Sequence, residues 1–142
     1  MVEFALLLPL AVGLTLGVVT GGTAYFRKVA IVDASREGAR YGATLLADNT
    51  TAGISAWEDN VRSRVVQAST GELSSPDVCV KLVYPTGASD CGVADPAGAS
   101  SEPTVRLVKV SAAKGATVEF VFANVSTTLT GRVAARYERD TG

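Results

Sequence analysis

The sequence of 142 residues contains no histidine, the side chain that most often serves as a general base in catalysis or as a metal ligand. It also lacks the G-x-S-x-G elbow of hydrolases, the phosphate-binding loop of nucleoside triphosphatases and the glycine-rich fingerprint of dinucleotide-binding folds. Its acidic residues show no spacing that is typical of a metal-binding loop. We therefore expect that the protein is not an enzyme and that it binds no cofactor and no metal.

Basic residues are also scarce, with 13 Lys and Arg against 14 Asp and Glu, and they form no cluster beyond Arg27-Lys28. A nucleic-acid partner is therefore not expected. The only two cysteines, Cys79 and Cys91, are too few for a structural zinc site in a chain without histidine. Their even number suits one disulfide in a chain that crosses or leaves a membrane. By closing the loop between them, this disulfide would add about 3 kcal/mol to the free energy of unfolding. Two unpaired, partly buried thiols are the alternative.

Charge is absent from residues 4–26, a run of 23 residues flanked by Glu3 and by Arg27-Lys28. As a helix this run would be roughly 34 Å long, enough to cross the hydrocarbon core of a bilayer. A cleaved signal peptide fits poorly, because the run is too long and is preceded by an acidic rather than a basic residue. We therefore predict a membrane-born helix that carries a small head outside the bilayer.

Four small or helix-bending residues mark this apolar run. Pro9 removes a backbone donor, so we expect a kink at that point of the helix. Gly13, Gly17 and Gly21 are spaced four residues apart and would form a ridge without side chains, against which another helix can pack closely. Glycine is also common in membrane helices, which is the simpler explanation. A lone membrane helix has no such partner in its own chain, so the packing interpretation requires another subunit.

The helix is expected to continue without a stop signal to Ala47 as an amphipathic segment. One set of residues at three- and four-residue steps predicts a buried face: Tyr25, Val29, Val32, Ala39, Ala43 and Leu46. Small residues also recur at four-residue spacing, and Gly38 and Gly42 among them indicate close packing, because glycine costs about 1 kcal/mol inside a helix. The predicted organisation is a membrane or filament-core helix (1–26), its amphipathic continuation (27–47) and a globular α+β head (48–142).

The head is predicted to contain a second helix over residues 56–69, capped by Ser55 with Glu58 completing a capping box. Four β-prone segments follow at 78–84, 104–111, 117–125 and 128–138, with a turn at 112–115. Residues 86–102 read as a long loop. Asp90 and Asp95 could in principle help to bind calcium there, but a solvated loop is what we expect. Two helices followed by about four strands indicate an α+β fold with an antiparallel sheet. Asn124 begins an N-x-S glycosylation pattern, a short motif that often occurs by chance.

Glu3 is the one charge that begins the apolar helix. It can simply complement the helix macrodipole. In an apolar assembly it would instead need a cation, and a neighbouring subunit's N-terminal amine is the nearest. The run VEFALLLP at residues 2–9 resembles the type IV pilins, and specifically the TadE-like pseudopilins of tight-adherence (Flp) pilus systems. ASREGARYGA at 34–43 is similar to the helix motif of that family, and TGRVAARYE at 130–138 resembles its last strand.

The resemblance implies a type IV pilin-like fold and a precursor whose basic leader is removed by a prepilin peptidase. It further implies that Glu3 recruits subunits at an assembly platform in the inner membrane, and that the head ends outside the cytoplasm in an extracellular filament for surface attachment. The glutamate of the family is the fifth mature residue, whereas here it is the third. Either two residues are missing from this numbering, or cleavage occurs elsewhere, or Met1 is an initiator. Partners would be identical or related pilin subunits, in a main or minor filament role. The alternative is a single-pass anchored envelope protein that binds a partner through its head without polymerising.

Overall fold

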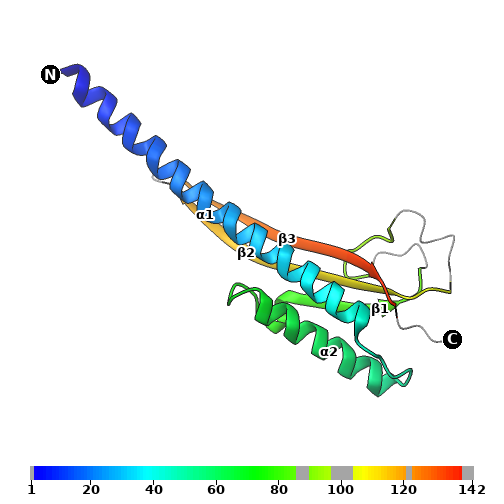
Figure 1. Ribbon diagram of the computed structural model, residues 1–142. Helices are drawn as coiled ribbons and strands as arrows, with labels where there is room; N and C mark the ends of the chain where they lie inside the picture. Colours follow the sequence, from blue (N-terminus) through cyan, green and yellow to red (C-terminus); the bar gives the residue numbers. More distant parts are fainter. Residues whose placement is uncertain (1, 86–89, 97–103, 121–122, 139–142) are drawn as a thin grey trace.

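One long helix, α1 (Val2–Thr44), runs the length of the molecule, and the rest of the chain packs on its C-terminal half (Figure 1). The computed structural model describes residues 2–85, 90–96, 104–120 and 123–138. A second helix, α2 (Thr51–Ala68), lies beside α1, and a short 3-10 turn, η1 (Ser75–Asp77), leads into the sheet. The N-terminal half of α1 projects away from these elements as a free rod (Figure 1). The predicted α+β, pilin-like layout is confirmed.

The end of α1 lies at Thr44, three residues before the predicted Ala47. The backbone N–H of Ala47 donates to the Tyr137 hydroxyl at 2.7 Å, so the chain has already left the helical path there. The carbonyl of Ala43, one of the orphan acceptors of the last turn, receives the N–H of Glu138 at 3.0 Å. A contact with the C-terminal strand, rather than a local stop signal, therefore ends the helix.

Helix α2 begins five residues earlier than predicted, and the capping box at Ser55 is wrong. Thr50 is the N-cap, and its hydroxyl accepts the N–H of Gly53 at 3.0 Å. Ser55 lies inside the helix, where its hydroxyl donates to the carbonyl of Thr51. Glu58 reaches across to Lys81 at 3.2 Å instead of closing a capping box. Threonine in the preceding turn therefore supplied a better cap than the serine that the pattern favoured.

The sheet has three antiparallel strands in the order β1 (Val78–Val83), β2 (Leu107–Phe120) and β3 (Ala123–Arg136). The predicted turn at 112–115 is wrong, because β2 passes straight through it and Gly115 pairs with Thr128. The separate strand predicted at 117–125 is also wrong, since residues 117–120 belong to β2 and residues 123–125 to β3. Pairing along all 14 residues of each strand outweighed the local turn propensity of an Ala- and Gly-rich stretch.

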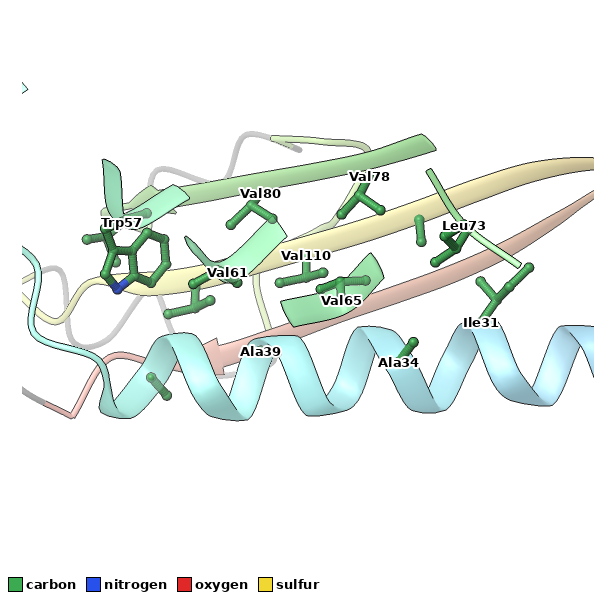
Figure 2. Packing of buried hydrophobic residues seen from close by; sticks show 14 of the residues in the cluster. Ile31, Ala34, Ala39, Trp57, Val61, Val65, Leu73, Val78, Val80 and Val110 are labelled. Carbon is green, nitrogen blue, oxygen red and sulfur yellow. The ribbon is translucent and has the colours of Figure 1, made fainter. Parts of the chain in front are cut away.

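The core lies between the two helices and one face of the sheet (Figure 2). Trp57, Val61 and Val65 of α2 are buried, as the apolar stripe of that segment predicts. Val80 and Val110 face them from the strands, and both are fully buried. Successive residues of a strand point to opposite faces, so in β1 and β2 the other face of the sheet is left to odd-numbered residues such as Lys109.

Candidate assembly helix and its anchorage

The N-terminal part of α1 is an uncovered apolar helix, which we call the bare half (residues 7–26). None of these residues is buried. Ten large apolar side chains are each between 46 and 76 % exposed: Leu7, Leu8, Leu10, Val12, Leu14, Leu16, Val18, Val19, Tyr25 and Phe26. Within the described residues, α1 is the one helix long and apolar enough to cross a membrane. Exposed apolar surface on this scale requires lipid or protein around it, and the length and composition of the helix suit a membrane anchor.

The hydroxyl groups of the bare half are compatible with an apolar surrounding. Thr15 donates to the carbonyl of Ala11, Thr20 to that of Leu16, and Thr23 to that of Thr20. Each bond lies within the helix itself, so these three donors need no water. The helix can therefore pass between lipid and protein without leaving these donors unsatisfied.

The glycine ridge of the bare half has open space around it. A Cβ atom added at Gly13, Gly17 or Gly21 would meet no heavy atom within 4 Å. Gly17, Ala24, Ile31 and Gly38 are seven residues apart and so share one side of the helix. The ridge therefore continues directly into the side of α1 that carries the head.

The C-terminal part of α1, the packed half (residues 27–44), shows what this side of the helix accommodates. A Cβ added at Gly42 would lie 2.9 Å from Trp57 and 3.1 Å from Val108, and one added at Gly38 would overlap the Val65 side chain. On the facing strand, a Cβ at Gly131 would lie 2.9 Å from the carbonyl oxygen of Ile31. Small residues on both elements thus let the helix and strand backbones approach closely.

The larger stripe predicted as the buried face is wrong in part. Tyr25 is 70 % exposed, Leu46 is 66 % exposed and Val29 is 38 % exposed. Ala39 and Ala43, which belong to both predicted patterns, are buried. The face that packs consists of the small residues, because a sheet and a helix must both fit against the same turns of α1.

Tyr137 and Trp57 hold the end of the packed half. The hydroxyl of Tyr137 donates to the carbonyl of Leu45 at 3.1 Å and accepts from Ala47, and the indole N–H of Trp57 donates to the same Leu45 carbonyl at 3.2 Å. The two rings meet edge to face with centroids 6.3 Å apart. The guanidinium group of Arg106 lies over the Tyr137 ring, 5.0 Å from its centre. Sequence reasoning placed Tyr137 in a strand and gave no sign of this contact, which spans 90 residues.

Charged pairs line the flank where α1 meets α2. Arg64 donates to Glu37 at 2.8 Å and lies 5.9 Å above the Tyr41 ring. The hydrogen bond from Arg64 lowers the pKa of Glu37 below its ordinary value. At the border with the bare half, Arg27 pairs with Glu72 at 3.6 Å. These pairs are largely exposed, so each adds little stability to the contact between the head and the helix.

The outer face of the sheet carries a loop fastened at two points. Cys79 of β1 and Cys91 form a disulfide with Cα atoms 5.7 Å apart. Lys109 of β2, whose side chain is completely buried, pairs with Asp95 at 2.7 Å and with Asp90 at 3.3 Å. Burial by itself lowers the pKa of Lys109, but hydrogen bonds to Asp95 and Asp90 raise it above its ordinary value. The expectation that Asp95 is solvated is therefore wrong, since its side chain is only 7 % exposed.

The remaining predicted residues are placed as follows. Glu3 lies in the first turns of α1, and its side chain is outside the described residues. Pro9 lies inside the continuous helix. Most of the predicted 86–102 loop is likewise outside the described part, apart from residues 90–96. Among the described residues, no group of three or more Cys, Asp or Glu is arranged to hold a metal ion.

Together these features describe an α+β protein with a pilin-like layout, whose long apolar N-terminal helix suits a membrane anchor. Residues 1–40 match a family model described as TadE: TadE-like protein. The match covers the first 40 of the 142 residues, so this segment is similar to the TadE-like family of the tight-adherence pilus system, and the resemblance seen in the sequence is confirmed. No curated protein and no solved structure matches the chain.

Proposed function

We propose that this protein is a structural subunit of a tight-adherence pilus-like filament, assembled through α1. The observation that carries the proposal is the bare half, an apolar helix with no buried residue and an open glycine ridge. A helix that served only as a membrane anchor would need length and hydrophobicity but no ridge. The ridge adds a surface against which a neighbouring α1 can pack.

The packed half supports the same proposal by example. There, the same side of the same helix is in direct contact with strand β3 and with helix α2. A second copy of α1 can use the open ridge in an equivalent way, with helices inside the filament and heads outside. This heterologous, head-to-tail type of contact generates helical filaments.

The starting point of assembly is assigned to Glu3. Its carboxylate would bind the N-terminal amine of a neighbouring subunit in the apolar core, where an unpaired charge is costly. The TadE-like family further suggests processing by a prepilin peptidase and insertion by an assembly platform in the inner membrane. The disulfide is consistent with a head outside the cytoplasm, and the filament would support surface attachment.

The test compares three variants of the full-length protein in its native host. Gly17→Leu fills the ridge, and Glu3→Ala removes the carboxylate. Val18→Leu adds bulk at a neighbouring position whose side chain is already 76 % exposed. We expect the first two variants to be lost from sheared filaments, as seen by immunoblot and negative-stain microscopy, and Val18→Leu to be incorporated as in the wild type. Fluorescence of Trp57, the only tryptophan, should show an intact head in all three.

The competing function makes the opposite prediction. A single-pass anchored envelope protein that never polymerises would be absent from sheared filaments in wild-type cells. Normal incorporation of both Gly17→Leu and Glu3→Ala would instead show that α1 does not mediate assembly through its ridge and Glu3. Either result would overturn the proposal.

A further inference from the structure

The strongest chemical feature outside the assembly helix is the contact between Lys109 and the loop on the outer face of the sheet. The Lys109 side chain is 0 % exposed, and its amine lies 2.7 Å from Asp95 Oδ1 and 3.3 Å from Asp90 Oδ2. Lys109 is in the central strand, flanked in the register by Lys81 and by Ala134. The small side chain of Ala134 leaves room beside it for the long lysine stem. An amine and a nearly buried carboxyl group are therefore held in direct contact.

Such a pair is energetically unusual. A buried ion pair loses the hydration of both charges, and the mutual attraction often fails to outweigh that loss. Replacing the two charges by one neutral amide would remove this penalty while keeping the two chain segments together. The two side chains already contain all the atoms of the amide, because an ammonium and a carboxylate differ from an amide by one water molecule.

We propose that Lys109 and Asp95 condense into an intramolecular amide cross-link, with Asp90 carrying the proton. The Lys109 ammonium first transfers one proton to Asp90. The neutral amine then attacks Cγ of Asp95, so that an N–C bond forms and one C–O bond breaks. The departing oxygen leaves as water with the proton from Asp90 and a second proton from the nitrogen. Asp90 returns to its carboxylate form, and no oxidant or other reagent is needed.

Proximity lowers the barrier to the condensation. Well-oriented intramolecular groups reach effective concentrations on the order of 10⁵ M or more, and the Lys109 nitrogen lies 2.7 Å from Oδ1 of Asp95, which is bonded to the carbon that it attacks. Because the resting pair is charged, deprotonation of the amine precedes the attack and makes the step slow. It occurs once in each molecule, after folding has assembled the three groups.

The product would tie the loop to the sheet a second time. The disulfide already links Cys91 to β1 through Cys79. The amide would link the same loop to β2 through Asp95 and Lys109. Two covalent ties to neighbouring strands would make this part of the head resistant to unfolding by force or by reducing agents, independently of how the protein assembles.

The chain contains its own control. Lys114 and Asp77 form a second lysine–aspartate pair at almost the same distance, 2.8 Å, but their side chains are 39 % and 21 % exposed. Water around this pair stabilises the charges and removes the advantage of condensation. We therefore expect an amide at Lys109 and none at Lys114.

The experiment measures the intact mass of the full-length protein in detergent, followed until it is constant at neutral pH. We expect the mass to be lower than that of the disulfide-bonded sequence by one water. After reduction and trypsin digestion, residues 82–106 should appear joined to residues 107–114, with no cleavage at Lys109 and normal cleavage at Lys114. Asp95→Ala should abolish the loss of water, and Asp90→Asn should slow it by about 100-fold.

The wild-type mass decides the matter even if a variant fails to fold. A full-length mass without loss of water, together with normal trypsin cleavage at Lys109, would overturn the proposal and leave a simple ion pair. Loss of water that persists in Asp95→Ala would place the cross-link elsewhere and would overturn it equally. Condensation of Asp90→Asn at the wild-type rate would exclude Asp90 as the proton carrier.

Discussion

The two halves of α1 have the same type of small-residue side and opposite environments. In the packed half, Gly38 and Gly42 are covered by α2 and the sheet, and nearby Ile31 is fully buried. In the bare half, a Cβ atom added at Gly13 or Gly17 would meet no heavy atom of another part of the chain within 4 Å. The helix itself is continuous across the border. What differs is only whether the rest of the chain reaches that part of it.

The two halves show how one helix can make two kinds of contact. A ridge of small residues can pack against different partners, because it has few side chains of its own and lets another backbone approach closely. In the packed half the partner is the head, which fixes the helix within the subunit. In the bare half the ridge is available to a partner from outside, which is the basis of the filament proposal.

The different roles of the two halves are tested most directly by adding the same side chain to each of them. Gly42→Leu would place a side chain into the space between Trp57, Val61 and Val108, and we expect it to lower the free energy of unfolding by about 3 kcal/mol through overpacking. Gly21→Leu adds the same atoms where no atom lies within 4 Å, and should leave the head stability unchanged. Urea unfolding of the full chain in detergent, followed by Trp57 fluorescence, measures both.

One result would contradict the expected difference in stability between these variants. If Gly21→Leu destabilised the head as much as Gly42→Leu, the bare half would be part of the folding unit of the head. The two halves would then differ in exposure only and not in role.

A second and smaller effect concerns the latch that ends the packed half. Tyr137→Phe removes the hydroxyl that accepts from Ala47 and donates to Leu45, and leaves a buried backbone N–H without this partner. We expect a loss of about 2 kcal/mol. Hydrogen exchange should increase around residues 44–47 and remain unchanged in the bare half. Unchanged exchange at both places would mean that the Trp57 ring alone holds this end.

A third prediction perturbs the head without touching α1. Hydrogen bonds from Lys114 and from the Ser74 hydroxyl and N–H lower the pKa of Asp77 to about 2. The group is thus more acidic in the folded than in the unfolded state, so its stabilising contribution is complete above about pH 4 and is lost as the pH falls toward 2. Asp77→Asn should flatten the pH dependence of urea unfolding in that window. An identical pH dependence in wild type and variant would contradict this assignment.

The sequence predicted those parts of the fold that depend on local periodicity. The apolar run, the stripe Trp57, Val61 and Val65 and the first strand all rest on residues within one element, and all are found near their expected places. The small residues at Gly38 and Gly42 likewise indicated close packing before any partner was visible. The disulfide followed from the cysteine count and the expected compartment.

The parts that sequence reasoning missed depend on contacts between distant segments. The strand β2 runs through an apparent turn because β3 pairs with it along its whole length. Lys109 looked like an ordinary strand residue, since nothing local shows that Asp90 and Asp95 fold over it. A buried Tyr25 stripe was favoured by size, but the close approach of the β3 backbone at Gly131 selects the small residues instead. In each case a partner element, rather than local propensity, decides the outcome.

The smallest expected effect lies at the border between the two halves. Arg27 pairs with Glu72 at 3.6 Å, and the two side chains are 54 % and 35 % exposed, so Glu72→Gln should cost less than about 1 kcal/mol and the effect should vanish in high salt. The pair nevertheless joins the first charged residue after the bare half to the segment that follows α2. Hydrogen exchange in detergent should therefore rise slightly at residues 27–30 and not at residues 34–42. A loss as large as that of Tyr137→Phe would mean that the pair is shielded from water, and that the covered part of α1 begins earlier than the head contacts indicate.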